Sequence, residues 1–288
     1  MTRKGREVKG FVGLAILIAL GALATSSVWS PVDAQAQAPE STLQKVLKRG
    51  TVIIGTRSTT PGFAFRDEKG DLVGFDIDLG REIAQGLFND PNKVQFEVVP
   101  GGGDRIPALV SGRVDAVISQ FSVFVERAQV VEFSLPYCNA DFSAIVKASS
   151  TYRKNADLNG KAVATRQGAE LEKLILKAIP KAKIQGYPEI SDAFLALRQG
   201  RAEAAFNDHA GGLFIMHKYP GQFRVILDPE NALDRNQYSI GVKQGDQIWL
   251  NYLNWALTRM KLTGKLRELH LKWLKTADLE PAWARERY

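Results

Sequence analysis

The sequence predicts an α/β protein with two lobes, each a β-sheet flanked by helices. Residues 108–119, ALVSGRVDAVIS, return as ALRQGRAEAAFN at residues 196–207. Each copy has a helical Ala-Leu end, a glycine at 112 or 200 where a left-handed helix end is wanted, and then a strand. Each copy also follows its own strand, helix and strand, the unit from which open α/β sheets are built.

The first 36 residues read as a secretory signal peptide. An apolar run over 11–23 leads through small residues to Ala34-Gln35-Ala36, and four bases precede it: Arg3, Lys4, Arg6 and Lys9. The run is shorter than the ~20 residues of a membrane-spanning helix. We therefore expect cleavage after Ala36 and a soluble protein in the periplasm. The single cysteine, Cys138, leaves no internal disulfide and lies too far along the chain for a lipid anchor.

The first lobe begins with a short helix over 41–49, capped by Ser41, and a buried strand TVIIGT over 51–56. DEKGD at 67–71 predicts a hairpin-like turn. The apolar spacing over 76–88 predicts a helix, and VQFEVVP at 94–100 a strand.

The second lobe repeats this plan with strand KAVAT at 161–165, a helix over 167–179 and strand KIQGY at 183–187. Ligands of open α/β sheets bind beyond the carboxyl ends of strands, where strand order switches. The two repeated strands end on Ser119 to Ser122 and on Asn207-Asp208. We therefore expect Ser119 and Ser122 on one wall of a cleft and Asp208 on the other.

Composition excludes several classes of function. The formal net charge is +7, and the first 36 residues hold four bases and two acids, which leaves +5 for the rest. These bases alternate with acids along helices such as 261–275, which indicates solvated faces rather than nucleic-acid binding. The three histidines lack metal-ligand spacing, and no phosphate loop or GxSxG elbow occurs. We expect no metal, no cofactor and a monomer.

Seven segments in order resemble the family 3 extracellular solute-binding proteins of ABC importers, the polar amino acid binders. They are LQKVLKRGTVIIGT, FRDEKGDLVGFDIDL, DRIPALVSGRVDAVIS, VERAQVVEFSLPY, LNGKAVATRQG, ALRQGRAEAAFND and YSIGVKQGD. The resemblance implies a type II periplasmic-binding-protein fold, an amino acid clamped between the lobes, and an inner-membrane permease as partner. It places two crossing strands near 139–143 and 237–242. The lobes are then 37–141, 142–240 and a return over 241–288.

The resemblance implies that Arg127 grips the ligand α-carboxylate, since a guanidinium offers two parallel donors to two oxygens. A surface arginine on a helix's first turn is the alternative. Ser119 and Ser122 fit as hydroxyl partners, or as satisfied strand-end serines. Asp208 fits the ligand ammonium, because a carboxylate in a closed cleft must be paired. Its alternative is a turn aspartate that starts the helix at His209.

Arg57 and Thr60 resemble the acidic amino acid binders of the family, in which arginine meets the side-chain carboxylate. The resemblance implies Arg105 as a second such donor, although that arginine is widespread in the family. The alternative for Arg57 is a side chain that faces solvent. Arg57, Arg105 and Arg127 outnumber Asp208 and Glu170, a surplus that glutamate or aspartate would balance.

The helix-start loop with Gly168 and Glu170 departs from the family, which has serine or threonine there to meet the α-carboxylate. Glu170 either points outward and stabilises its own helix or enters the pocket and selects another ligand. Two further departures are Gly101-Gly102-Gly103 and Phe124, which replaces a capping threonine.

Two other functions compete with the importer component. Cyclohexadienyl dehydratases resemble this chain and use a glutamate near Glu170 as general acid, a step that a raised pKa in a closed pocket would serve. A binding module that signals to a membrane receptor is the third possibility. A binding protein should be stabilised by an amino acid, whereas a dehydratase should be stabilised by prephenate or arogenate or should consume it.

Overall fold

The computed structural model describes residues 40–99, 103–226 and 236–276, together with Pro281 and Ala284. For Ala169, Glu170, His209 and Ala210 it describes the backbone alone. The expected signal peptide and its cleavage after Ala36 lie outside the described residues, as do Gly101 and Gly102.

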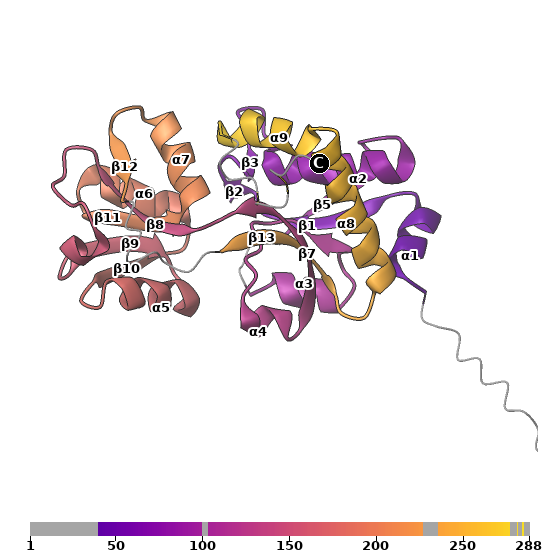
Figure 1. The fold of residues 1–288 in the computed structure, drawn as a ribbon, viewed down its shortest axis with the longest axis horizontal. Helices are drawn as coiled ribbons and strands as arrows, with labels where there is room; N and C mark the ends of the chain where they lie inside the picture. The colour runs from indigo at the N-terminus through magenta and orange to yellow at the C-terminus, as the bar shows by residue number, and fades with distance from the viewer. Residues whose placement is uncertain (1–39, 100–102, 227–235, 277–280, 282–283, 285–288) are drawn as a thin grey trace, which may run out of the picture. The chain divides into compact units, whose positions relative to one another are not determined.

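The first lobe is built on a five-stranded sheet in the order β5-β1-β6-β13-β7 (Figure 1). β1 pairs in parallel with β5 and β6, whereas β13 pairs antiparallel with β6 and β7. A small antiparallel sheet β2-β3-β4 lies in the connection after β1. The bounds are β1 Val52–Thr56, β2 Thr59–Thr60, β3 Ala64–Arg66, β4 Leu72–Val73, β5 Val94–Val98, β6 Ala116–Val117, β7 Val131–Asn139 and β13 Gln237–Lys243.

The second lobe is built on a sheet in the order β10-β9-β11-β8-β12. β9 pairs in parallel with β10 and β11, and β8 is antiparallel to β11 and β12. The chain passes from β7 of the first sheet to β8 of the second through Ala140 and Asp141. The bounds are β8 Phe142–Lys147, β9 Ala162–Arg166, β10 Lys183–Tyr187, β11 Ala204–Asp208 and β12 Phe223–Val225.

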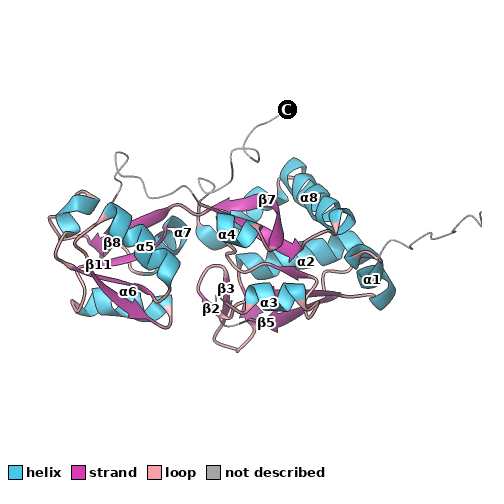
Figure 2. Ribbon diagram, turned by 90° about the horizontal axis from the view of Figure 1, so that it is seen from below, coloured by secondary structure: helices cyan, strands magenta, loops and turns pink. Residues whose placement is uncertain are grey.

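Helices cover these sheets (Figure 2). The first lobe has α1 Thr42–Arg49, α2 Phe75–Phe88, α3 Arg105–Val110, α4 Val125–Ala128, α8 Gln247–Leu262, α9 Lys265–Leu269 and the π-helical turn His270–Leu274. The second has the 3₁₀ turn Asn155–Leu158, α5 Ala169–Ala178, α6 Ile190–Gln199 and α7 His209–Lys218. The two-lobed α/β architecture predicted from the sequence is confirmed.

The repeated segment takes the same structure in both lobes. α3 and α6 run toward Gly112 and Gly200, whose φ angles of 74° and 77° are left-handed, and strands β6 and β11 follow. In each sheet three parallel strands stand in the chain order second, first, third. This is a reversal of strand order of the kind at which open α/β sheets bind ligands.

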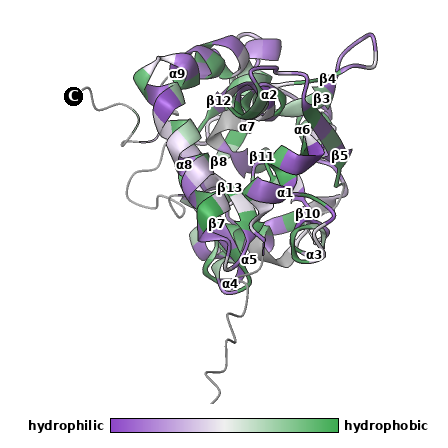
Figure 3. Ribbon diagram, turned by 90° about the vertical axis from the view of Figure 1, so that its right-hand side faces the viewer, coloured by the Kyte–Doolittle hydropathy of each residue, from purple (hydrophilic) through white to green (hydrophobic). Residues whose placement is uncertain are grey.

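Local chemistry explains the helix ends. Ser41 caps α1 as expected and also forms a capping box with Gln44, and Gly50 ends that helix in the left-handed region. Helix α8 buries one side, with Trp249, Leu253 and Leu257, against the first lobe's core. Its surface alternates between hydrophobic and hydrophilic residues in Figure 3.

Each lobe has its own core. The first lobe has a large apolar cluster around α2, β1 and α8 and a smaller one around α3 and β6, and the second lobe has one cluster under α5 and one under α6. Within the described residues, no helix has the length and apolar character needed to cross a membrane.

Candidate functional site

A polar cleft lies where the carboxyl ends of the parallel strands from both sheets meet. Residues after β1 and β6 supply one wall, and the ends of β9 and β11 supply the other. A hydrogen bond from Thr59 Oγ1 to Glu189 Oε2, 2.9 Å long, links the two sides. The lining comprises Arg57, Thr60, Arg105, Gln120, Ser122, Phe124, Arg127, Phe142, Arg166, Leu171, Glu189, Ile190, Asn207, Asp208 and Tyr238.

Most of the residues proposed from the sequence meet in this cleft. Six of them line it: Arg57, Thr60, Arg105, Ser122, Arg127 and Asp208. Ser119 and Gly168 lie outside the lining as the structure describes it. Glu170 lies in the first turn of α5, and its side chain is outside the described atoms.

Arg105 and Arg127 share one aromatic support. The Cζ atoms of Arg105 and Arg127 lie 4.8 Å and 5.3 Å from the centroid of the Phe121 ring, and Arg127 also lies 4.6 Å from the ring of Phe124. Stacked rings hold a guanidinium by cation–π attraction through its flat face. Phe124 therefore supports Arg127 instead of capping α4, which has no side-chain cap.

Backbone carbonyls orient the same two arginines. Arg105 Nη1 donates to Ser119 O at 2.9 Å, and Arg127 Nη1 donates to Ser122 O at 3.1 Å. Arg105 is 1% exposed. Burial, followed by the nearby charges of Arg57, Arg127 and Arg166, lowers the pKa of Arg105 below its usual range.

Arg57 follows β1 directly and is 9% exposed, so the alternative of a solvent-facing side chain is wrong. Its Nε and Nη2 atoms meet no hydrogen-bond partner among the residues that the structure describes. Burial and the charge of Arg166 lower its pKa to about 10, so the guanidinium still carries its charge at neutral pH. A buried cation with unused donors is prepared to receive an anion.

Asp208 combines two roles that the sequence analysis treated as alternatives. Its Oδ1 accepts from the Gly211 amide at 2.7 Å and caps α7, and the side chain also lines the cleft. Burial raises the pKa of Asp208, and the hydrogen bond from Gly211, the nearby Tyr238 hydroxyl and Arg166 oppose that rise.

The two serines differ. Ser122 Oγ accepts from Asn236 Nδ2 at 2.7 Å, which ties the cleft to the residue before β13. Ser119 presents its carbonyl to Arg105, and its Oγ, fully buried, has no hydrogen-bond partner among the described atoms. Ser119 therefore holds an arginine in place at this point in the fold.

Gly168 caps α5 at a φ of 152° and carries no side-chain cap. A Cβ at this position would meet nothing within 4 Å, so its conformation and not crowding favours glycine. The backbone amides that begin α5 therefore lack a local side-chain acceptor in the described structure.

Besides apolar residues, Asn207 and Glu189, four residues in or behind the lining were not among the site residues chosen from the sequence. Arg166 ends β9, Tyr238 comes from β13 and Gln120 follows β6. Gln120 has a φ of 46°, an uncommon value for a side chain other than glycine. Arg166 had a signal: it stands at the carboxyl end of a predicted strand, the position that Arg57 takes in the first lobe.

Asp76 is the fourth, and it holds the Gln120 turn from behind. Its Oδ2 accepts from the Gln120 amide at 3.2 Å, and its Oδ1 accepts from the Tyr137 hydroxyl at 3.1 Å. At 1% exposure, burial raises the Asp76 pKa to about 7, although Arg57 and Arg105 oppose the rise. The carboxyl therefore exchanges its proton close to neutral pH.

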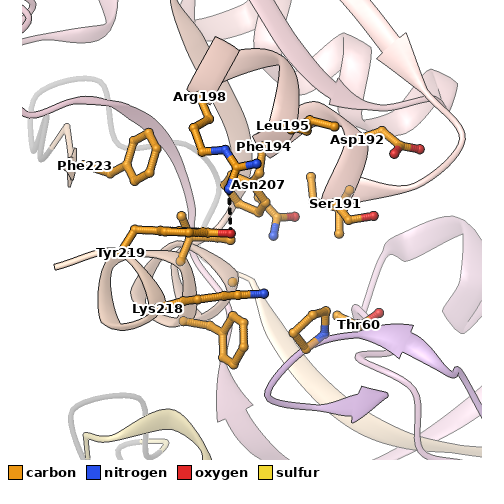
Figure 4. A pocket seen from close by; sticks show the side chains of 15 residues that line it. Thr60, Ser191, Asp192, Phe194, Leu195, Arg198, Asn207, Lys218, Tyr219 and Phe223 are labelled. Carbon is orange, nitrogen blue, oxygen red and sulfur yellow. Dashed lines mark hydrogen bonds between the residues drawn. The ribbon is translucent and has the colours of Figure 1, made fainter. Parts of the chain in front are cut away.

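A second pocket opens beside the polar cleft, between α6 and α7 of the second lobe and the Thr60-Pro61 segment (Figure 4). Thr60, Ile190 and Asn207 line both. Apolar side chains such as Phe194 dominate its wall, and Arg198 is engaged with the Tyr219 hydroxyl at 2.8 Å. Such a wall offers little to the charged ends of an amino acid, so the polar cleft is the stronger candidate site.

The family model for bacterial extracellular solute-binding proteins, family 3, matches residues 52–276. The chain belongs to this family. Members of the family are extracellular, in keeping with the periplasmic location expected from the sequence.

Curated members of the family differ in the ligands that their names give. The chain is 28% identical to the ABC transporter glutamine-binding protein GlnH of Bacillus subtilis, over 89% of this chain and 93% of that protein. It is 25% identical to the glutamate/aspartate import solute-binding protein of Escherichia coli, over 89% of this chain and 87% of that protein.

A solved structure agrees in fold. The ancestral amino acid-binding protein AncCDT-1, described as a precursor of cyclohexadienyl dehydratase, matches with a TM-score of 0.71 and 32% identity. The match covers 82% of this family 3 chain and all of the other. The type II fold expected from the resemblance is confirmed.

Proposed function

We propose that this protein is the amino acid-binding component of an ABC importer and that it prefers an amino acid with an acidic side chain. The preference rests on one observation: the cleft gathers Arg57, Arg105, Arg127 and Arg166. Only two acidic residues, Asp208 and Glu189, line the cleft against these four arginines in the described structure. A ligand of net negative charge balances this surplus of cations.

The ligand's three charged groups find partners by type. Arg127, on its aromatic support, takes the α-carboxylate in two parallel hydrogen bonds. Asp208 and the Tyr238 hydroxyl take the ammonium. Arg57, whose Nε and Nη2 are unused within the described structure, takes the side-chain carboxylate with Thr60 beside it.

Capture proceeds by closure of the lobes. A ligand bonded by both walls binds the closed form more tightly than the open one, and it shifts the population by that difference in affinity. The chain crosses between the lobes at Ala140 and Asp141, and beside this connection Asn236 N donates to Asp141 Oδ1 at 3.1 Å. An inner-membrane permease then binds the closed, ligand-bound form. The protein acts as a monomer in the periplasm.

Thermal unfolding of the mature protein, stripped of bound ligand, tests the proposal with a panel of amino acids. A ligand at 1,000 times its dissociation constant stabilises the native state by ~4 kcal/mol, which is visible as a raised midpoint. Glutamate or aspartate should raise it most. If only neutral or cationic amino acids raise it, the proposed preference is wrong.

The same panel includes prephenate and arogenate, which address the dehydratase alternative. We place that alternative second, because the similar structure just described is itself named an amino acid-binding protein. Absorbance of the product would detect consumption of either compound. Such consumption would make the dehydratase the preferred function.

Within the panel, an Arg57→Ala variant locates the selective contact. We expect it to lower affinity for glutamate by about tenfold or more, the scale of a hydrogen bond to a charged group, with glutamine affected less. Equal loss for both ligands in titration calorimetry would show that Arg57 does not select the side chain.

A further inference from the structure

The two lobes place the same dipeptide at the same point of the same kind of sheet. β1 ends at Thr56, which Arg57 follows, and β9 ends with Thr165-Arg166. Each strand lies between two parallel neighbours, where strand order reverses. Arg57 and Arg166 are therefore equivalent side chains of the two lobes, and both line the polar cleft.

The residue before each arginine is a buried threonine, which fixes the backbone position from which the arginine side chain leaves its sheet. Thr56 and Thr165 are both fully buried, and Thr165 Oγ1 donates to Phe206 O of the neighbouring strand at 3.0 Å. Thr56 is held by its backbone pairing with Val98, and its Oγ1 has no hydrogen-bond partner among the described atoms. In both lobes a residue fixed in the sheet directly precedes the arginine and sets the direction in which its side chain leaves the sheet. The two guanidinium groups consequently approach one cleft from opposite lobes.

Like charges in this position oppose one another. Arg166 lowers the pKa of Arg57, second only to burial, and it also lowers the pKa of Arg105. Both shifts are directions expected when cations approach in a partly desolvated space. Arg57 keeps its charge at neutral pH, because its pKa of about 10 is still well above 7.

The acidic groups near the pair offset it only in part. Asp76, Glu189 and Tyr238 raise the Arg57 pKa, but less than burial and Arg166 lower it. Asp76 shares its oxygens with the Gln120 amide and the Tyr137 hydroxyl, and Glu189 accepts from Thr59. Asp208, the acid on the Arg166 side, caps α7.

We propose that Arg57 and Arg166 form an anion gate: they repel each other across the empty cleft and let the lobes close fully only around a ligand that carries an anionic group between them. This inference rests on the proposed function, and it makes Arg166 a specificity-determining residue of the second lobe. Selection for an acidic side chain is then selection at the closing step, because a neutral amino acid leaves the repulsion in place.

The first experiment compares Arg166→Gln with the wild type by titration calorimetry, using glutamate and glutamine as probes. We expect glutamate affinity to fall about tenfold or more, while glutamine affinity stays within about threefold or rises. Arg166→Lys, which keeps a cation, should recover part of the preference for glutamate. The matched control is Arg201→Gln, an exposed arginine of the same lobe, which should change neither affinity. Equal losses for both ligands would overturn the gate.

The second experiment needs no ligand, so it separates the gate from the proposed function. Lys69 and Lys183 are exposed residues of different lobes. Spin labels on cysteines introduced at these two positions report the distance between the lobes by electron paramagnetic resonance. Cys138 is buried and stays unlabelled. In the empty protein, Arg166→Glu replaces repulsion with attraction to Arg57 and should shift the distances toward the closed form.

Arg201→Glu serves as the control for this charge reversal and should leave the distances unchanged. A distribution in Arg166→Glu that matches the wild type would refute the gate, whichever ligand the cleft binds. If the distances shift but no acidic amino acid binds, the gate holds and the proposed ligand class is wrong.

Discussion

At the scale of single residues, the role of Asp76 is the one that the sequence predicts least. Its carboxyl reaches the Gln120 amide and the Tyr137 hydroxyl from the first turn of α2, and so it supports the turn whose carbonyls hold Arg105. Burial raises its pKa to about 7, from 3.8 for an exposed aspartate. The folded protein therefore retains a proton that the unfolded chain releases.

The sign of the resulting pH dependence follows from linkage. Between about pH 4 and 7 the native state binds more protons than the unfolded state, so the Asp76 contribution to stability falls as pH rises through that window. Three pKa units correspond to about 4 kcal/mol as an upper figure. Asp76→Asn should remove this decline, and its stability relative to wild type should improve from pH 4.5 to pH 8. Urea unfolding at both pH values measures the difference, and parallel changes in the two proteins would contradict it.

Arg127 makes a different prediction, because the α-carboxylate is common to all amino acids. Arg127→Ala should weaken every ligand alike, by about tenfold or more for the loss of a charge-assisted bidentate contact. Arg127→Lys keeps the charge but not the fork, so it should restore only part of the affinity. Calorimetry with glutamate and glutamine tests this, and wild-type affinity in the alanine variant would remove Arg127 from the site.

The residues that the sequence revealed share one property. Arg57, Ser122 and Asp208 stand at or shortly after strand ends, where the rule for open sheets predicts ligand contacts, and all three line the cleft. Arg166 obeys the same rule, but the sequence alone did not set it apart from Gly168 and Glu170 in the loop that follows it. Asp76 could not be found in this way, since a charged residue in a helix's first turn is ordinary and its burial depends on tertiary packing.

At the scale of elements, patterns with a local cause were predictable. The helix stop at Gly200, the Ser41 capping box and the start of α7 after Asp208 follow from backbone chemistry within a few residues. Features with a distant cause were not, such as the hydrogen bond between Ser122 and Asn236, residues 114 apart in sequence.

Helix α7 supplies the prediction at this scale, because Asp208 serves both the helix and the cleft. Asp208→Ala removes the cap and should cost about 1 kcal/mol of stability in addition to the loss of binding. Asp208→Asn keeps an oxygen for the Gly211 amide but loses the charge that the ligand ammonium needs. It should therefore retain most of the stability and lose most of the affinity.

Urea unfolding and calorimetry on both variants separate these two roles. If Asp208→Asn binds glutamate as tightly as wild type, the carboxylate serves only as a cap. If Asp208→Ala is as stable as wild type, the cap contributes nothing measurable to α7.

At the scale of the whole molecule, the duplicated plan explains why the site is shared. Two sheets with the same strand order present the same kind of edge, and each contributes an arginine after a buried threonine. A cleft made from such halves is electropositive before any ligand arrives. The chain beyond residue 36 also carries a positive balance of +5.

That electropositive cleft predicts a salt effect that depends on ligand charge. Oppositely charged partners associate faster at low ionic strength because the field steers their approach, and screening lengths fall from ~30 Å at 0.01 M to ~3 Å at 1 M salt. The association rate of glutamate, with one net negative charge, should fall several-fold over about that range. Glutamine carries no net charge and should change much less. Stopped-flow fluorescence, with the four tryptophans beyond residue 36 as reporters, measures both rates. The Arg166→Gln variant should make the association rate of glutamate less dependent on salt, because it removes one of the four arginines that line the cleft. Equal slopes for glutamate and glutamine would mean that the arginines act only after the ligand has entered.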